Sequence, residues 1–87
     1  MDIEWDARAE DTLRRLLGQL DKREREGHEA RAREAAEVHA RAHGLRGVNP
    51  DAATVGFVKA ASTVMKPQVK NALRRVGIDP QKYEDFF

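Results

Sequence analysis

Apolar side chains recur at helical spacing in several segments of the chain, and no segment shows the two-residue alternation of a strand. The first segment predicts a helix from Asp6 or Ala7 to Leu20, with the Asp6 carboxylate as N-cap for free backbone N–H groups. Its apolar stripe consists of Ala9, Leu13, Leu16, Leu17 and Leu20. Ile3 and Trp5 precede the cap, where a side chain can fold back as a hydrophobic staple. We therefore expect Trp5 to be an anchor of the core.

The stretch DKREREGHE, residues 21 to 29, is charged and contains Gly27, which costs about 1 kcal/mol inside a helix relative to alanine. It is either a linker or the solvated start of a second helix, and we expect a solvated helix or turn. The second helix itself is predicted from Glu29 to His43, with Gly44 as its C-cap. Small residues on its buried face would allow another helix to approach closely. That face is predicted to hold Ala35, Val38, Ala42 and Leu45.

The stretch HGLRGVNPDAATVGFVKA, residues 43 to 60, joins the second helix to a third. Gly44 can end one helix with a positive φ, Asn49 can cap the next, and Pro50 suits its first position because a missing N–H costs nothing there. The third helix is predicted from Pro50 to about Met65. Its apolar residues cover a wide arc, which is typical of a central helix. They are Val55, Phe57, Val58, Ala61, Val64 and Met65.

Proline and glycine also divide the C-terminal part of the chain. Pro67 is predicted to end or kink the third helix, and a fourth helix to run from Pro67 to Val76 with Gly77 as its C-cap. The final stretch DPQKYEDFF repeats the capping pattern, since Asp79 can cap and Pro80 can follow it. The last aromatic side chains either fold onto the core, which we expect, or form an exposed docking patch. These side chains are Tyr83, Phe86 and Phe87.

Together these segments predict an all-α fold, a compact bundle of four to five short helices with the third at its centre. The 87 residues make one helical domain, which is predicted to span residues 1–87. A chain of this length buries only about 60% of its unfolded surface. We therefore expect a protein partner or self-association to supplement a marginal core.

Composition bears on the cellular compartment of the protein and on whether it associates with a membrane. The chain has no cysteine, which excludes disulfides and thiolate metal sites and fits a reducing compartment. No apolar run approaches the ~20 residues needed to span a bilayer. The acidic start MDIEWDARAED lacks the basic and apolar regions of a signal peptide. We expect a cytoplasmic protein that does not engage a membrane.

The net charge of +1 hides an uneven distribution. Acidic residues dominate the start of the chain, whereas residues 52 to 78 contain lysines and arginines but no acid. The two parts can attract each other within the fold, or the basic segment can face an acidic partner. Four cations would share one helical face if Pro67 only kinked the axis, and such a stripe can track phosphates. They are Lys59, Lys66, Lys70 and Arg74. A solvated face is the more ordinary interpretation, and the low net charge argues against strong non-specific DNA binding.

Candidate chemistry is sparse. His39 and His43 have the i, i+4 spacing of a helical zinc site, but the sequence HARAH lacks the glutamate of HExxH. His28 would lie about 16 Å from His39 along the axis, too far to bind the same ion. The two histidines are therefore only weak metal candidates. Ser62 has no local signature of a nucleophile, and no glycine-rich phosphate loop is present. We predict no catalytic residue, no cofactor and no enzymatic activity.

Two stretches resemble a known family. WDARAEDTL, residues 5 to 13, is similar to the opening of the protochlorophyllide reductase C-terminal domain. EVHARAHGLRGVNPDAATVGFVKA, residues 37 to 60, looks like that family's helix, glycine turn and final helix ending in Lys-Ala. The resemblance covers residues 3–61 and is carried by Trp5, Ala9, Glu10, Leu13, Ala40, Arg41, Gly44, Val48, Val58, Lys59 and Ala60. Two departures stand out. LLGQLDKRERE replaces the family's Pro-Phe-x-x-Arg stretch, and residues 62–87, a predicted C-terminal helical extension, have no counterpart.

The family's domain closes the B subunit of light-independent protochlorophyllide reductase and also occurs as a small stand-alone protein. The iron–sulfur ligands lie elsewhere in that subunit, and a chain without cysteine cannot hold such a cluster on thiolates. The resemblance therefore implies a non-enzymatic accessory or protein-docking module, linked to tetrapyrrole reductase or electron-transfer machinery. The C-terminal aromatics and the alanine face of the second helix are its candidate surfaces. The alternative is a histone-like nucleic-acid binder that uses the basic stripe, although nucleic acid is not the favoured partner.

Overall fold

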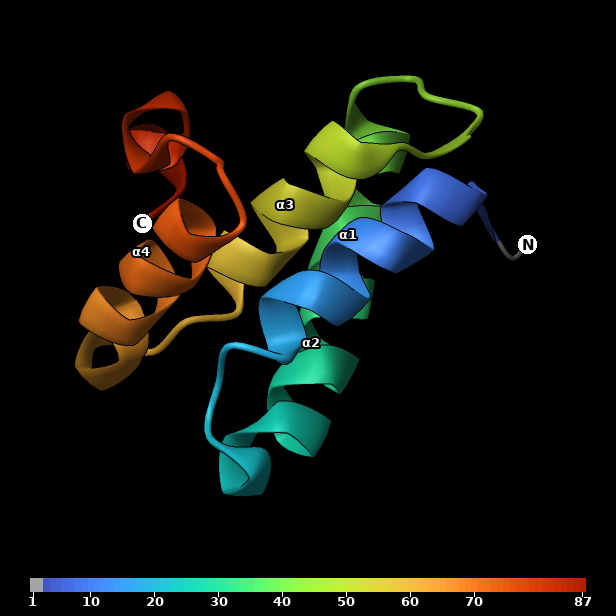
Figure 1. The fold of residues 1–87 in the computed structure, drawn as a ribbon. Coiled ribbons are helices and arrows are strands. Elements are labelled where there is room, and N and C mark those ends of the chain that lie inside the picture. The colour runs from blue at the N-terminus through green and yellow to red at the C-terminus, as the bar shows by residue number, and fades with distance from the viewer. Residues whose placement is uncertain (1–2) are drawn as a thin grey trace.

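The computed structural model describes residues 3–87, and most of that stretch is helical (Figure 1). The α-helices are α1 (Ala7–Leu17), α2 (Lys22–Ala42), α3 (Pro50–Lys59) and α4 (Lys66–Arg75). The 3-10 helices are η1 (Thr63–Met65) and η2 (Pro80–Phe86), and the strands are β1 (Glu4–Trp5) and β2 (Gly47–Val48). The predicted all-α bundle is confirmed. Among residues 3–87, no helix has both the length and the apolar character needed to cross a membrane.

Helix α3 lies at the centre of the bundle, as its wide apolar arc predicts. Every residue from Ala52 to Val58 is buried. Helices α1 and α2 pack on one part of α3, while α4 and η2 contact another, so that α3 separates the two halves of the molecule (Figure 1). The main apolar cluster forms around Phe57, with leucines from α1 and α4.

Helices α2 and α3 approach each other closely at Gly56. A Cβ atom on Gly56 would lie 2.3 Å from the carbonyl oxygen of Ala32 and 2.6 Å from the Cβ of Ala36. The two backbones can therefore meet only because Gly56 has no side chain and α2 presents alanines. The inner face of α2 consists of His28, Ala32, Ala36, His39 and Ala40.

The predicted buried face of α2 is wrong. Val38 is 54% exposed and Leu45 is 36% exposed, while Ala35 is half-buried and Ala42 is exposed. The prediction followed the larger apolar side chains of this segment. The face of α2 that contacts Gly56 instead carries alanines, because a longer side chain at this contact would hold the two helices apart.

The first two helices differ from prediction at the turn that joins them. Helix α1 ends at Leu17, yet Leu20 remains buried in the turn that follows. Helix α2 begins at Lys22, with the Asp21 carboxylate accepting from the backbone N–H of Arg23 at 3.2 Å. The charged stretch 21–29 is therefore the solvated start of α2 rather than a linker, and Gly27 is tolerated inside the helix.

The third helix is shorter than predicted, because α3 ends at Lys59 and the chain turns before η1. Pro67 does not kink a continuous helix; it occupies the first turn of α4, where its missing N–H has no cost. A helix running through Pro67 would lose a backbone hydrogen bond and place the ring against the carbonyl of Thr63. Val64, predicted within the apolar arc of the third helix, is consequently 83% exposed.

The local caps follow the sequence closely. Gly44 and Gly77 have φ values of 69° and 84°, so both helices that precede them end in the left-handed conformation that favours glycine. The backbone N–H of Ile78 donates to the carbonyl of Leu73 at 2.9 Å, which completes a Schellman motif at the predicted C-cap Gly77. The predicted N-cap carboxylates and amide all accept from the backbone two or three residues ahead, and they belong to Asp6, Asn49 and Asp79.

A two-stranded parallel sheet was not predicted. Strand β1 pairs with β2, so that Trp5 lies opposite Val48 and Glu4 lies opposite Gly47. Two residues per strand are too few to show an alternation in the sequence. The pairing depends on Gly47, because a Cβ there would lie 2.8 Å from the carbonyl oxygen of Glu4. Trp5 contacts both apolar clusters but remains half-buried, so it anchors the N-terminal segment at the edge of the core.

Candidate functional site

The aromatic residues at the end of the chain fold onto the core, as expected. The segment η2 returns against α3 and α4 after the turn at Gly77 (Figure 1). Tyr83, Phe86 and Phe87 all pack against the main apolar cluster, and each remains half-buried. One side of each ring is therefore fixed by packing while part of it stays accessible to a partner.

Two lysine ammonium groups and one histidine imidazole lie against the rings of Phe86 and Phe87. The Nζ atom of Lys59 lies 5.6 Å from the ring centroid of Phe86, and that of Lys70 lies 5.1 Å from the ring centroid of Phe87. The imidazole of His39 packs edge-on against Phe86 with 5.6 Å between centroids. The C-terminal aromatic surface, as we define it, consists of His39, His43, Lys59, Lys70, Tyr83, Phe86 and Phe87.

The condition for one continuous helical stripe of cations is not met, because Pro67 stands in the first turn of α4 and does not kink a longer helix. Lys66, Lys70 and Arg74 share a face of α4 by their spacing of four, but Lys59 belongs to α3, and the chain changes direction between the two helices. The Nζ atom of Lys70 lies 3.8 Å from the carboxylate of Glu84, and Arg74 donates to the side-chain oxygen of its neighbour on α4 at 3.1 Å. The four cations therefore do not lie along one continuous helix.

The two weak metal candidates lie next to each other. The ring centroids of His39 and His43 are 4.3 Å apart with a tilt of 40°. His39 is only 9% exposed, and burial lowers its pKa, as do the charges of His43 and Lys59, while Asp51 acts in the opposite direction. Within residues 3–87 no group of three or more His, Cys, Asp or Glu side chains is placed to hold a metal ion.

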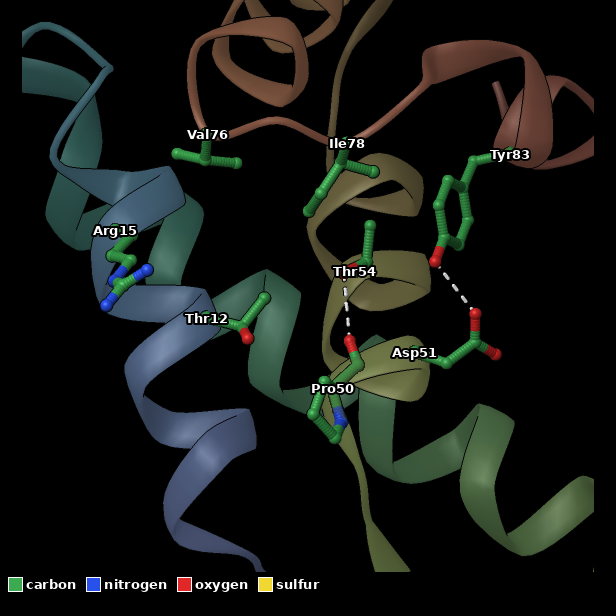
Figure 2. Close-up of a pocket in the computed structure, with 8 residues that line it drawn as sticks. All are labelled: Thr12, Arg15, Pro50, Asp51, Thr54, Val76, Ile78 and Tyr83. Carbon is green, nitrogen blue, oxygen red and sulfur yellow. Dashed lines mark hydrogen bonds between the residues drawn. The ribbon is translucent and has the colours of Figure 1, made fainter.

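A pocket of about 310 Å³ adjoins the C-terminal aromatic surface at Tyr83 (Figure 2). It lies between α1, the first turn of α3 and the connection from α4 to η2. The Tyr83 hydroxyl donates to the Asp51 carboxylate at 2.8 Å, and the Thr54 hydroxyl donates to the carbonyl of Pro50 at 2.8 Å. The lining residues are Thr12, Arg15, Pro50, Asp51, Thr54, Val76, Ile78 and Tyr83.

The electrostatics of this pocket suit binding better than reaction. Burial, together with the Asp51 carboxylate, raises the pKa of Tyr83 to about 12, so the hydroxyl stays protonated and holds its hydrogen bond at neutral pH. Val76 and Ile78 provide an apolar wall, while the carboxylate of Asp51 and the guanidinium of Arg15 lie on its border. The arrangement can accept an apolar side chain with a polar group beside it.

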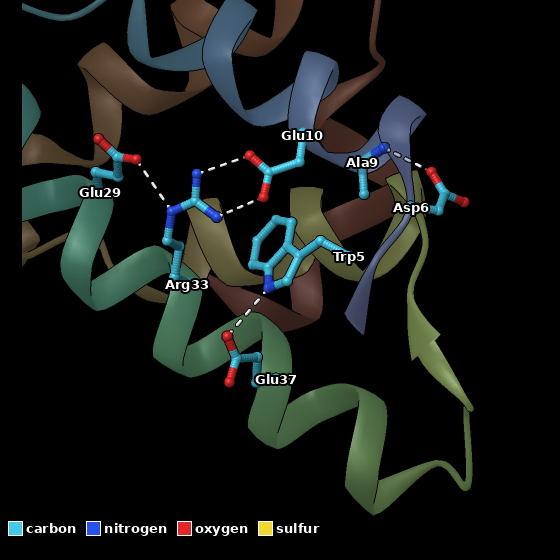
Figure 3. A network of polar contacts seen from close by, with 7 residues as sticks. All are labelled: Trp5, Asp6, Ala9, Glu10, Glu29, Arg33 and Glu37. Atoms are coloured by element: carbon cyan, nitrogen blue, oxygen red, sulfur yellow. Dashed lines mark hydrogen bonds and ion pairs between the residues drawn. The ribbon is translucent and has the colours of Figure 1, made fainter. Parts of the chain in front are cut away.

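A second hollow, of about 400 Å³, lies between α1 and α2 and is dominated by paired charges. Arg33 donates to both carboxylate oxygens of Glu10, at 2.7 and 2.8 Å, and to Glu29 at 3.0 Å (Figure 3). The Arg33 guanidinium holds the pKa of Glu10 below its usual range. It also lies 4.8 Å from the ring of Trp5, whose indole N–H donates to Glu37 at 3.0 Å. These groups already bind one another, so the network joins α1, α2 and β1 rather than offering a ligand site.

Sequence reasoning found the aromatic side chains and Lys59 and Lys70, but it did not find the pocket. Its walls come from α1, the first turn of α3 and the turn after α4, and no sequence spacing connects these segments. In the sequence, the only local signal at Asp51 is its place near the N-terminus of a helix, and the only one at Ile78 is its place after the C-cap glycine.

We compared the chain with models of protein families, with curated proteins and with solved structures, and none of them matches it. The resemblance to the protochlorophyllide reductase C-terminal domain therefore rests only on the residues that carry it in the sequence.

Proposed function

We propose that this protein is a non-enzymatic accessory module that docks on another protein through the C-terminal aromatic surface and the pocket beside it. One observation supports this most strongly. Tyr83, Phe86 and Phe87 are held by the core, yet each stays half-buried, and Tyr83 also lines an apolar-walled pocket. Aromatic side chains that are rigid before binding lose little conformational freedom in a complex, and they dominate the energetics of many interfaces.

The chemistry of the surface indicates the kind of partner. An apolar side chain of the partner would fill the pocket against Val76 and Ile78, while acidic groups beside it would meet Lys59 and Lys70 at the rim. Lysines suit the rim of an interface better than its centre, because their ammonium groups are strongly hydrated. We therefore propose a partner segment that is apolar at its centre and acidic at its ends.

The resemblance bears on the fold more than on this surface. Several residues that carry it are fully buried, among them Ala9, Leu13, Ala40 and Val48. They pack α1, α2 and α3 together, whereas the three aromatic side chains of the proposed docking surface belong to residues 62–87, which have no counterpart in the family. A link to tetrapyrrole reductase or electron-transfer machinery is therefore proposed from the resemblance alone, and the partner need not be the family's own.

The nucleic-acid alternative stays a prediction from the sequence, and no feature of the geometry favours it. A salt titration of duplex DNA binding tests it, because phosphate contacts make affinity fall steeply with salt. Binding at low salt that disappears at high salt, and that is lost in Lys66→Gln and Arg74→Gln, would support the alternative over protein docking.

A photo-crosslinking experiment tests the docking proposal. Benzoylphenylalanine in place of Phe87 in the full chain should give a discrete adduct in the native host, and the same group at the exposed Arg23 should not. A binding measurement with the purified partner is the second test: Phe86→Ala should raise the dissociation constant at least about tenfold, as expected for an aromatic anchor. Val64→Ala removes an exposed apolar side chain outside the surface and should leave affinity unchanged. Equal effects of the two variants, or a monomer that forms no adduct from position 87, would contradict the proposal.

A further inference from the structure

His28 is enclosed at the contact between α2 and α3. Its side chain is 0% exposed, and its ring packs edge-on against Phe57 with 4.8 Å between centroids. The Nε2 atom lies 2.9 Å from the carbonyl oxygen of Phe57. Because a carbonyl can only accept, Nε2 must carry the hydrogen, and this fixes the tautomer of the neutral ring.

The Phe57 carbonyl belongs to the last turn of α3, where backbone carbonyls lack their usual partners. The backbone N–H of Ala61, four residues ahead, donates to Val58 instead, at 3.1 Å. His28 therefore acts as a side-chain cap on the end of α3. Arg31, one turn further along α2, donates to the carbonyl of Ala60 at 3.4 Å and reinforces the same contact.

The second ring nitrogen of His28, Nδ1, is buried and has no hydrogen-bond partner among the described residues. In the neutral ring it is an acceptor without a donor, which is a modest cost. Protonation would place an N–H group and a positive charge at this point, where no described residue is a hydrogen-bond partner for Nδ1.

We propose that His28 is an acid-sensitive latch: its neutral ring holds the start of α2 against the end of α3, and its protonation releases that contact.

The charges around the ring do not compensate for its burial. On α2, Arg31 opposes protonation and Glu24 favours it, while the α3 segment from Ala52 to Val58 carries no charge. On the α1 side, the carboxylate of Glu10 is already bound by Arg33. Burial has the largest effect on the pKa of His28 and lowers it, outweighing the opposing effect of the hydrogen bond that the ring donates to the Phe57 carbonyl.

The lowered pKa of His28 determines the direction in which the stability of the fold changes with pH. In the unfolded chain His28 binds a proton near its ordinary pKa of about 6.5. In the folded chain the pKa of His28 is lower, so the ring is neutral at pH 7 and its full contribution to the stability of the fold is present there. As the pH falls below about 6.5, the equilibrium constant for folding should fall by up to about tenfold per pH unit, until the folded-state pKa is reached.

A histidine NMR titration of the full chain tests the latch directly. The ring nitrogens of His28 should report the tautomer with hydrogen on Nε2, and the ring should stay neutral well below pH 6.5. When it does protonate, the backbone amides of residues 57–61 should shift together with it. A ring that titrates near 6.5, or that carries its hydrogen on Nδ1, would overturn the proposal.

Two variants separate the latch from general acid sensitivity. His28→Gln keeps an N–H group that can reach the Phe57 carbonyl, but it does not titrate in this range. Its denaturation midpoint should depend less on pH between 7.5 and 5.5 than that of the natural chain. Arg23→Gln changes an exposed side chain on the same helix and should preserve the natural dependence, and the same pH profile for both variants would refute the latch. If His28→Gln does not fold, the titration of the natural chain decides alone.

Discussion

Replacing Gly56 by alanine should destabilise the protein strongly, although alanine is the better helix former. The added Cβ would lie 2.3 Å from the carbonyl oxygen of Ala32, 2.6 Å from the Cβ of Ala36 and 2.7 Å from the backbone nitrogen of Ala36. Favourable contacts between heavy atoms lie near 3.5–4.0 Å, so α2 and α3 would have to separate by roughly 1 Å. Two of the three obstacles are backbone atoms, which cannot turn aside as the end of a flexible side chain can.

The magnitude follows from two opposing effects. Overpacking a tight contact usually costs about 1–3 kcal/mol, and the backbone obstacles place this site at the upper end or beyond. Higher helix propensity opposes the loss by about 1 kcal/mol. We expect a net destabilisation of about 2 kcal/mol or more. That is a large share of the roughly 4–13 kcal/mol that a chain of this length has at about 0.05–0.15 kcal/mol per residue.

Urea denaturation followed by far-UV circular dichroism measures this effect, with the m-value showing whether the transition remains two-state. Gly27→Ala in α2 is the matched control. Its added Cβ would meet only the guanidinium of Arg31, at 3.3 Å, and that flexible group can move away. The control should therefore gain up to about 1 kcal/mol of stability.

A Gly56→Ala protein as stable as the natural chain would refute the reasoning. Such a result would mean that the backbones of α2 and α3 do not meet at this residue, and that the alanine face of α2 has another cause.

Three further predictions rest on single contacts. Asn49→Ala removes the side chain that accepts from the backbone N–H of residue 52 at 2.8 Å, and it should lower the free energy of unfolding in urea by about 1 kcal/mol. Asp51→Asn should lower the pKa of Tyr83 from about 12 toward 10 without reaching it, because burial remains; Tyr83 is the only tyrosine, so its ultraviolet absorbance reports the titration directly. Arg33→Met should cost about 0.5–1 kcal/mol at pH 7, a low figure because the Arg33–Glu10 pair is half-exposed. Because the pKa of Glu10 is lowered in the fold, the loss of stability in Arg33→Met should be present above pH ~4.5 and should fade as the pH falls through the pKa of Glu10 in the folded protein. Urea denaturation of both proteins at a series of acidic pH values measures this change.

Local signals in the sequence predicted the helices and their caps well. Asp6, Asn49 and Asp79 each act on a backbone N–H only a few residues away, so their role depends on the neighbouring residues alone. Gly44 and Gly77 act in the same way at the ends of helices. These signals predicted the number and order of the α-helices but not the lengths of α1, α2 and α3.

Contacts between distant segments were harder to predict. Val38 has the larger side chain, but Ala36 faces inward, and only the position of Gly56 on another helix explains the choice. The same holds for His28, whose partner is a carbonyl on α3. Its sequence neighbourhood of arginines and glutamates suggested a solvated residue. The candidate site was predicted in part, because its aromatic residues are adjacent in the chain while the walls of its pocket are not.

The pairing of β1 with β2 has a consequence for how the chain folds. It joins Glu4 and Trp5 to residues that follow the whole of α1 and α2, so the α1–α2 pair is enclosed in a closed loop of backbone. That loop can close only after both helices have formed and turned back, and its closing entropy must be met before Val48 contacts Trp5. We therefore expect the strand pair to form late, after the helices have packed on α3.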